Sequence, residues 1–274
     1  MRYTTPSIKY VLKNFRYVFP FAIIPAIFFA LSLDPAAINT MLKAIATGNS
    51  AKLEFSVIFH AVSIFNFSSL RVFFAGLVGF VLLIVCISML MALLEKHMRI
   101  GKRTYNGIFS KLNDNLISTG GMCVLFVCIY ELWTLITAAV LFVVMHIGSK
   151  IAVWVLSVLV FLALQVALLC VIFLFYLWLP CLQITGFKAF EALKYSYQLS
   201  APVKGKVVLG QMISLTTAEI IICACSYVFT GWVLVSVAAV LYACMVLLYC
   251  VRMQIAYFER AQLERADLKK YYHF

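Results

Sequence analysis

Long apolar runs alternate with short polar connections along the whole of this 274-residue chain. A helix needs about 20 largely apolar residues to cross the hydrocarbon of a bilayer, and six of the runs approach or exceed that length. We predict membrane spans at residues 17–33, 72–94, 121–147, 151–179, 207–229 and 232–251. The pattern therefore predicts an all-α, polytopic membrane helix bundle with six transmembrane helices in a single membrane domain.

The polar connections carry a charge asymmetry that predicts the orientation of the bundle. The connection Glu95–Asn115 holds five basic residues, and the positive-inside rule places such a segment in the cytoplasm. The predicted cytoplasmic segments are then residues 1–16, 95–116, 181–206 and 252–274, so both termini are cytoplasmic. Of the 22 Lys and Arg residues, 18 fall inside on this assignment. The four outside are Lys43, Lys52, Arg71 and Lys150.

Two segments need separate interpretation. Residues 55–70 are uncharged, but sixteen residues extend only about 24 Å as a helix, so we expect an interfacial or re-entrant helix on the outer face. Residues 1–16 have apolar positions at helical spacing and four basic residues, which predicts an amphipathic cytoplasmic helix before the first span. A basic start, an apolar run and Ala30-Leu31-Ser32 also match a cleaved signal peptide loosely.

Composition narrows the class of protein further. With 65% hydrophobic and 12% charged residues, and a mean hydropathy of +1.05, the chain is too apolar for a water-soluble domain. The net charge of +12 sits in the connections between spans and does not indicate nucleic-acid binding. We expect these basic residues to contact anionic lipid headgroups. The candidates are Lys102, Arg103, Lys111, Lys204 and Lys206.

The sequence contains no pattern typical of an active site. There is no G-x-S-x-G, H-E-x-x-H, C-x-x-C or Walker loop, and the four histidines are scattered along the chain. The nine cysteines lie within or at the ends of apolar runs, where we expect them to behave as small apolar residues. We therefore predict a protein that is not an enzyme and has no cofactor and no metal site.

Three polar residues stand near the centres of consecutive spans: Glu131, Gln165 and Glu219. An ionised carboxylate at that depth costs at least about 2.5–3.5 kcal/mol, and no Lys or Arg lies in a predicted span core to pair with it. We expect both glutamates to be protonated or to bind a cation, to face inward, and to lie within reach of Gln165. This layer either holds helices together through hydrogen bonds or forms a proton or cation site.

One stretch resembles a known group of proteins. The residues ALKYSYQL at 192–199, followed by Lys204-Gly205-Lys206 and a span, look like the segment before the last helix pair in uncharacterised bacterial six-span membrane proteins. That group includes relatives of the membrane domain of glycerophosphoryl diester phosphodiesterases. The resemblance implies a protein of the bacterial plasma membrane. It does not imply phosphodiesterase activity, which in such fusions belongs to a separate soluble domain.

Two functional hypotheses from different classes follow. The first is a non-catalytic membrane scaffold or accessory factor of the bacterial cell envelope, which presents basic segments to lipid headgroups. A membrane-protein partner or a second copy of the chain fits such a role. The second is a small secondary transporter that uses Glu131 and Glu219 as proton or cation sites. Water access to the polar layer distinguishes them, because a sealed layer favours the scaffold and a hydrated cavity favours the transporter.

Overall fold

The computed structural model describes residues 3–47, 53–147, 149–229 and 231–268, and these ranges contain helices but no β-strand. The first elements in the chain are α1 (Thr4–Lys13), α2 (Phe15–Leu31), α3 (Pro35–Thr47), α4 (Phe55–Val62) and α5 (Leu70–Ile100). They are followed by α6 (Ile108–Met145), α7 (Lys150–Leu174), α8 (Trp178–Thr185) and α9 (Ala189–Ser200). The last are η2 (Ala201–Val203), α10 (Lys204–Val228), α11 (Trp232–Arg260) and η3 (Ala266–Leu268).

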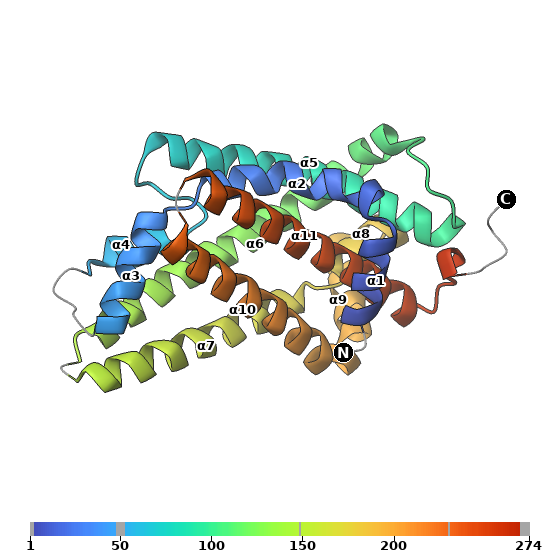
Figure 1. The fold of residues 1–274 in the computed structure, drawn as a ribbon. Coiled ribbons are helices and arrows are strands. Elements are labelled where there is room, and N and C mark those ends of the chain that lie inside the picture. Colours follow the sequence, from blue (N-terminus) through green and yellow to red (C-terminus); the bar gives the residue numbers. More distant parts are fainter. Residues whose placement is uncertain (1–2, 48–52, 148, 230, 269–274) are drawn as a thin grey trace.

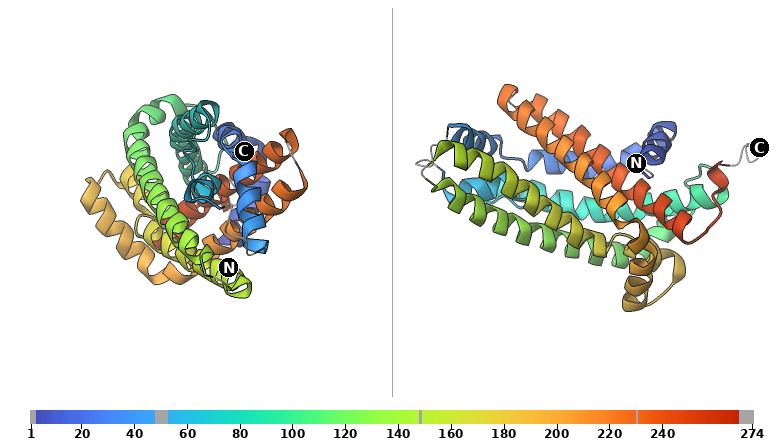
Figure 2. Two further views of the ribbon diagram at one scale, coloured as in Figure 1. Left: turned by 90° about the vertical axis from the view of Figure 1, so that its left-hand side faces the viewer. Right: turned by 90° about the horizontal axis from the view of Figure 1, so that it is seen from below.

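The long helices form a closed ring. Helix α2 packs against α5, α5 against α6, α6 against α7, α7 against α10, α10 against α11, and α11 returns to α2. Figure 1 shows these helices running along the long dimension of the molecule, with α3 and α4 at one end and α1, α8 and α9 at the other. Two further views show the same arrangement end-on and from below (Figure 2). The first and last long helices of the chain are therefore neighbours.

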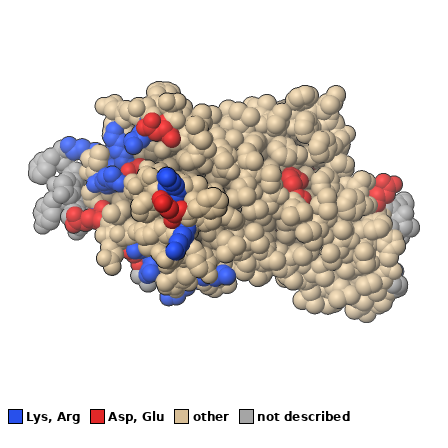
Figure 3. All heavy atoms as spheres, turned by 180° about the vertical axis from the view of Figure 1, so that it is seen from behind, with Lys and Arg blue, Asp and Glu red and all other residues tan. Residues whose placement is uncertain are grey.

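The two ends of the bundle differ in charge. Lys and Arg side chains gather at one end on the face shown in Figure 3, and the broad belt beside them is free of basic atoms on that face. We call this end, formed by α1, the connection between α5 and α6, α8, α9 and η3, the basic end. The end that carries α3 and α4 is the opposite end. This asymmetry is the three-dimensional form of the charge pattern along the sequence.

The described residues confirm the all-α class, and their helices have the length and composition that fit a multi-pass membrane protein. Five stretches are long and apolar enough to cross a bilayer, namely 70–100, 108–145, 150–185, 189–228 and 232–260, and α1 with α2 makes a sixth if that bent pair is one span. Large apolar side chains such as Ile117 and Trp154 are exposed on the outer faces of the long helices. A lipid environment covers such surfaces, whereas in water they would favour association.

The shortest span of the ring is α2. Its 17 residues include Pro20 and Pro25, and the chain bends by 101° where α1 meets it. Each proline removes one N–H from the helix, and α2 packs between α5 and α11. The bend turns α1 away from the direction of the spans, so that α1 lies across the basic end against α11.

Two glycines let neighbouring chain segments approach α5 closely. A Cβ atom at Gly79 would lie 3.3 Å from the backbone nitrogen of Phe29, so α2 packs directly against the backbone of α5. A Cβ atom at Gly76 would lie 2.8 Å from the carbonyl oxygen of Ile64. The irregular segment after α4 is therefore seated on α5 at a position that only glycine can occupy without a shift of the backbone.

The structure differs from the predicted element boundaries at several points. In the predicted interfacial segment 55–70, α4 covers only Phe55–Val62, residues 63–69 form an irregular connection, and Leu70 begins α5. The fourth span was predicted to end at Pro180. Instead the helix is interrupted after Leu174, and α8 begins at Trp178 with Pro180 in its first turn. A proline is tolerated there because the first N–H groups of a helix have no partner within the helix.

The C-terminal half of α11 is the most enclosed part of the molecule. The sixth span was predicted to end near Val251 and to be followed by a cytoplasmic tail, but α11 continues to Arg260, and residues 250–258 are all buried. Helices α1, α8 and α9 surround this part of α11. Arg252 is only 1% exposed, which corrects the expectation that it belongs to a solvated cytoplasmic tail.

Candidate functional site

Glu131 holds the irregular segment that follows α4. Its Oε1 atom accepts hydrogen bonds from the backbone N–H groups of Ile64 (2.9 Å) and Phe65 (3.2 Å), and its Oε2 atom accepts one from the Ser63 hydroxyl (2.8 Å). The adjacent Tyr130 hydroxyl donates to the carbonyl of Val62 at 2.8 Å. Backbone groups outside a helix need such partners when water is excluded. Tyr130 and Glu131 of α6 therefore satisfy backbone groups at the C-terminal end of α4 and just after it.

Gln165 connects α7 to α10. Its side chain is fully buried; the amide nitrogen donates to Glu219 Oε2 at 2.5 Å, and the amide oxygen accepts from the Thr216 hydroxyl at 3.2 Å. Trp133 on α6 donates to the carbonyl of Leu164 at 2.8 Å, one residue before Gln165. Polar side chains of the membrane interior therefore join three consecutive helices of the ring.

The polar layer expected from the sequence is thus divided into two parts. Glu219 lies within hydrogen-bond distance of Gln165, as expected, whereas Glu131 is bonded to residues 63–65 instead. Tyr130 is within electrostatic range of both carboxyl groups, and Tyr242 of α11 is within range of Glu219. Ser63 and Tyr242 could not be predicted as partners, since a hydroxyl in an apolar run does not reveal which group it faces.

A groove at the basic end is lined by positive charge. It lies at the bend between α1 and α2 and has a volume of about 460 Å³. The residues that line it are Leu12, Lys13, Asn14, Phe15, Arg16, Tyr17, Arg103 and Tyr105. Arg103 donates to the carbonyl of Lys13 at 3.4 Å, and Tyr17 donates to the carbonyl of Thr104 at 2.9 Å. These bonds attach the connection between α5 and α6 to the bend.

The basic residues predicted to contact lipid lie at the basic end. Lys102, Arg103 and Lys111 belong to the connection and to the first turn of α6, and Lys204 and Lys206 begin α10; all five side chains are exposed. Of these, Arg103 lines the groove, and the Lys204 ammonium group lies 6.0 Å from the centre of the Phe173 ring. Sequence reasoning did not anticipate that Lys13 and Arg16 would lie beside Arg103.

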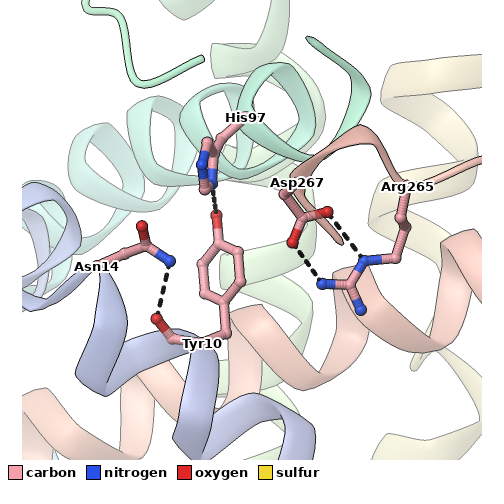
Figure 4. A network of polar contacts seen from close by, with 5 residues as sticks. All are labelled: Tyr10, Asn14, His97, Arg265 and Asp267. Carbon is pink, nitrogen blue, oxygen red and sulfur yellow. Dashed lines mark hydrogen bonds and ion pairs between the residues drawn. The ribbon is translucent and has the colours of Figure 1, made fainter. Parts of the chain in front are cut away.

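Polar contacts gather where α1, α5 and η3 meet, and one of them, between Tyr10 and His97, joins α1 to α5 (Figure 4). The Tyr10 hydroxyl and His97 Nδ1 are 2.5 Å apart, and Arg265 pairs with both carboxylate oxygens of Asp267 at 3.1 and 2.7 Å. The Asn14 amide donates to the Tyr10 carbonyl at 2.9 Å. Burial raises the pKa of Tyr10 well above its usual value, so the phenol in contact with His97 keeps its proton.

The described residues provide no metal cluster, because no three His, Cys, Asp or Glu side chains come together in them. The cysteines are free thiols, and those at positions 128 and 244 are exposed rather than buried. Compared with known proteins, the chain matches no family model, no curated protein and no solved structure.

Proposed function

We propose that this protein is a non-catalytic integral membrane protein that acts as a scaffold or accessory factor of the bacterial cell envelope. The observation that carries the proposal is that each of the three polar residues predicted for the membrane interior is hydrogen-bonded to another group of this chain. Glu131 is bonded to residues 63–65, and Gln165 to Thr216 and Glu219. Side chains engaged in this way hold helices together, which supports a structural role for these three residues.

Six spans with the basic end in the cytoplasm fit this proposal. The concentration of Lys and Arg at one end supports that orientation, and the resemblance of residues 192–206 to bacterial six-span membrane proteins supports a plasma-membrane location. We expect a cysteine placed at Gly107, in a cysteine-free variant, to react with an impermeant maleimide only when the cytoplasmic side is opened. A cysteine at Lys43, at the opposite end, should react in intact cells. The reverse labelling pattern would overturn the orientation.

The groove at the bend between α1 and α2 presents basic side chains that can bind anionic lipid headgroups. Lys13, Arg16 and Arg103 are exposed around it, and each basic residue near an anionic surface contributes about 1 kcal/mol to lipid association. Replacing all three with glutamate is expected to reduce the amount of anionic lipid that co-purifies, and to remove the stabilisation that anionic nanodiscs give relative to zwitterionic ones. The measurements are quantitative lipid extraction and the midpoint of thermal unfolding.

The matched control reverses three charges at the opposite end. Lys43, Arg71 and Lys150 are likewise exposed, so their replacement by glutamate changes the net charge by the same amount. If both triple variants lose the same quantity of anionic lipid, the basic end has no special affinity for headgroups, and only the total charge of the protein matters.

A transporter is the second candidate, and one observation favours it. Among the described residues, the hydrogen bond of Glu219 is made through Oε2 to Gln165, and its side chain is only partly buried, so one carboxyl oxygen can bind a proton or cation. Proton and sodium flux in reconstituted vesicles separates the candidates. A scaffold is expected to show no flux above protein-free vesicles. Flux that Glu219→Gln abolishes and Glu131→Gln preserves would replace the scaffold with a transporter.

A further inference from the structure

Arg252 is a buried cation that has no anionic partner among the described residues. One of its terminal nitrogens, Nη2, donates to the Ser214 hydroxyl at 3.1 Å, and Ser214 in turn donates to the carbonyl of Gly210 at 2.9 Å. Its Nε and Nη1 atoms have no hydrogen-bond partner among the described residues. Within that part of the chain the ion pairs are Glu95 with Arg99 and Arg265 with Asp267, so no carboxylate there compensates the Arg252 charge.

Further buried polar groups without partners lie on the chain segments that face this guanidinium. The hydroxyls of Tyr176 and Tyr249 and the Nε2 atom of Gln211 are buried and have no partner among the described residues. Both tyrosines are within electrostatic range of Arg252, and their rings are in edge-to-face contact with centroids 5.7 Å apart. Gln211 lies one helical turn before Ser214 on α10, on the same side of that helix.

These groups come from three different parts of the fold. Arg252 and Tyr249 are three residues apart on α11, Gln211 is on α10, and Tyr176 is placed inward by the interruption between α7 and α8. The N-terminal helix α1 covers the cluster, because a Cβ atom at Gly210 would lie 2.9 Å from Thr4 Oγ1 and 3.5 Å from Arg252 Nη1. Gly210 thus lets α1 and the guanidinium approach the same point of α10.

The chemistry of the cluster indicates the missing partner. An unpaired buried charge is strongly destabilising, and a buried donor without an acceptor adds a further cost. The guanidinium N–H groups, the phenol O–H groups and the amide N–H₂ group can all donate hydrogen bonds. A negatively charged acceptor would satisfy the charge and the donors together. Because the donors come from separate helices, a tetrahedral oxyanion accepts them more readily than a planar carboxylate.

We propose that Arg252, Tyr176, Tyr249 and Gln211 form an internal site for an oxyanion of the phosphate class, closed on the basic end by α1. Arg252 provides the charge and a forked set of donors, which is the geometry that favours arginine in phosphate recognition. The tyrosine hydroxyls and the Gln211 amide position the remaining oxygens. The phosphate group belongs either to a lipid headgroup or to a small soluble anion, and both have the same chemistry at this site.

The experiment measures the midpoint of thermal unfolding of the purified full chain in neutral detergent micelles. One arm titrates inorganic phosphate against chloride at matched ionic strength, and the other titrates short-chain phosphatidic acid into the same micelles. Ligand that binds only the folded protein raises the midpoint in a saturable way. A response to inorganic phosphate assigns a soluble anion, and a response to phosphatidic acid alone assigns a lipid headgroup. No response in either arm overturns the proposal.

Variants show whether the response belongs to this site. Arg252→Gln is expected to weaken the apparent affinity by roughly tenfold or more, since hydrogen bonds to charged groups are the strong ones. Arg99→Gln, which removes an exposed arginine at the same end, should leave the response unchanged. Tyr249→Phe keeps the ring but removes one donor, so it should weaken binding several-fold. This variant tests the site if Arg252→Gln does not fold. Equal responses in the wild type and in either site variant would also overturn the proposal.

Discussion

Glu131→Ala is expected to lower the free energy of unfolding by about 2–5 kcal/mol, because it leaves the N–H groups of Ile64 and Phe65 and the Ser63 hydroxyl without their acceptor. The segment they belong to is seated on α5 at Gly76, so its release also uncovers that contact. Chemical or thermal unfolding in detergent, followed by circular dichroism, measures the change.

Two variants make the comparison specific. Glu131→Gln keeps a carbonyl oxygen that can accept from both backbone N–H groups, so its cost should be about 1 kcal/mol, and Ser63→Ala, which removes one of the hydrogen bonds, should cost a similar amount. If alanine and glutamine at position 131 have equal effects on stability, the hydrogen bonds to residues 63–65 do not stabilise the fold.

Phe258→Ala is expected to cost about 3–5 kcal/mol of stability, the usual range for truncating a buried phenylalanine. Phe258 is 1% exposed and lies in the part of α11 enclosed by α1, α8 and α9. From the sequence this residue belonged to a cytoplasmic tail, where the same change would have little effect. The unfolding midpoint of the purified variant therefore tests whether the end of α11 is a structural core.

The matched control is Phe190→Ala on α9. Phe190 is at the same end of the molecule but is 87% exposed, so we expect its truncation to change the stability by less than about 0.5 kcal/mol. Comparable losses for the two variants would mean that the basic end is not packed as described.

Hydropathy predicted the all-α class, because five of the six predicted spans contain a helix long and apolar enough to cross a bilayer, whereas α2 reaches that length only together with α1. The prolines show that rules based on the local sequence do not always predict where a helix ends. Pro180 was expected to end a helix, yet it lies in the first turn of α8, and Pro20 and Pro25 lie inside α2. In each place the cost of the proline depends on backbone hydrogen bonds and packing contacts that the local sequence does not encode.

The partners of the polar residues were harder to predict. The depth of Glu219 and Gln165 in their spans correctly indicated that they could meet, since depth is readable from position along a helix. Glu131 has a similar depth, but its partners include backbone N–H groups of an irregular segment. Which backbone groups of such a segment lack an acceptor cannot be read from the sequence. Arg252 was counted as a surface charge because a charge rule assigns every basic residue at the end of a span to the connection.

The closed ring has a consequence for how the protein is made. Helix α2 packs against α11, and α1 covers the enclosed half of α11, although more than 200 residues separate these elements along the chain. The ribosome synthesises α1 and α2 first, when only α5 can become a neighbour of α2. The contact of Tyr10 with His97 can form once α5 is made, whereas the segment that holds Asp267 reaches them only at the end of synthesis. The basic end therefore closes only after the last helix has entered the membrane. Until then, lipid or an insertion factor has to cover the side of α2 that later contacts α11.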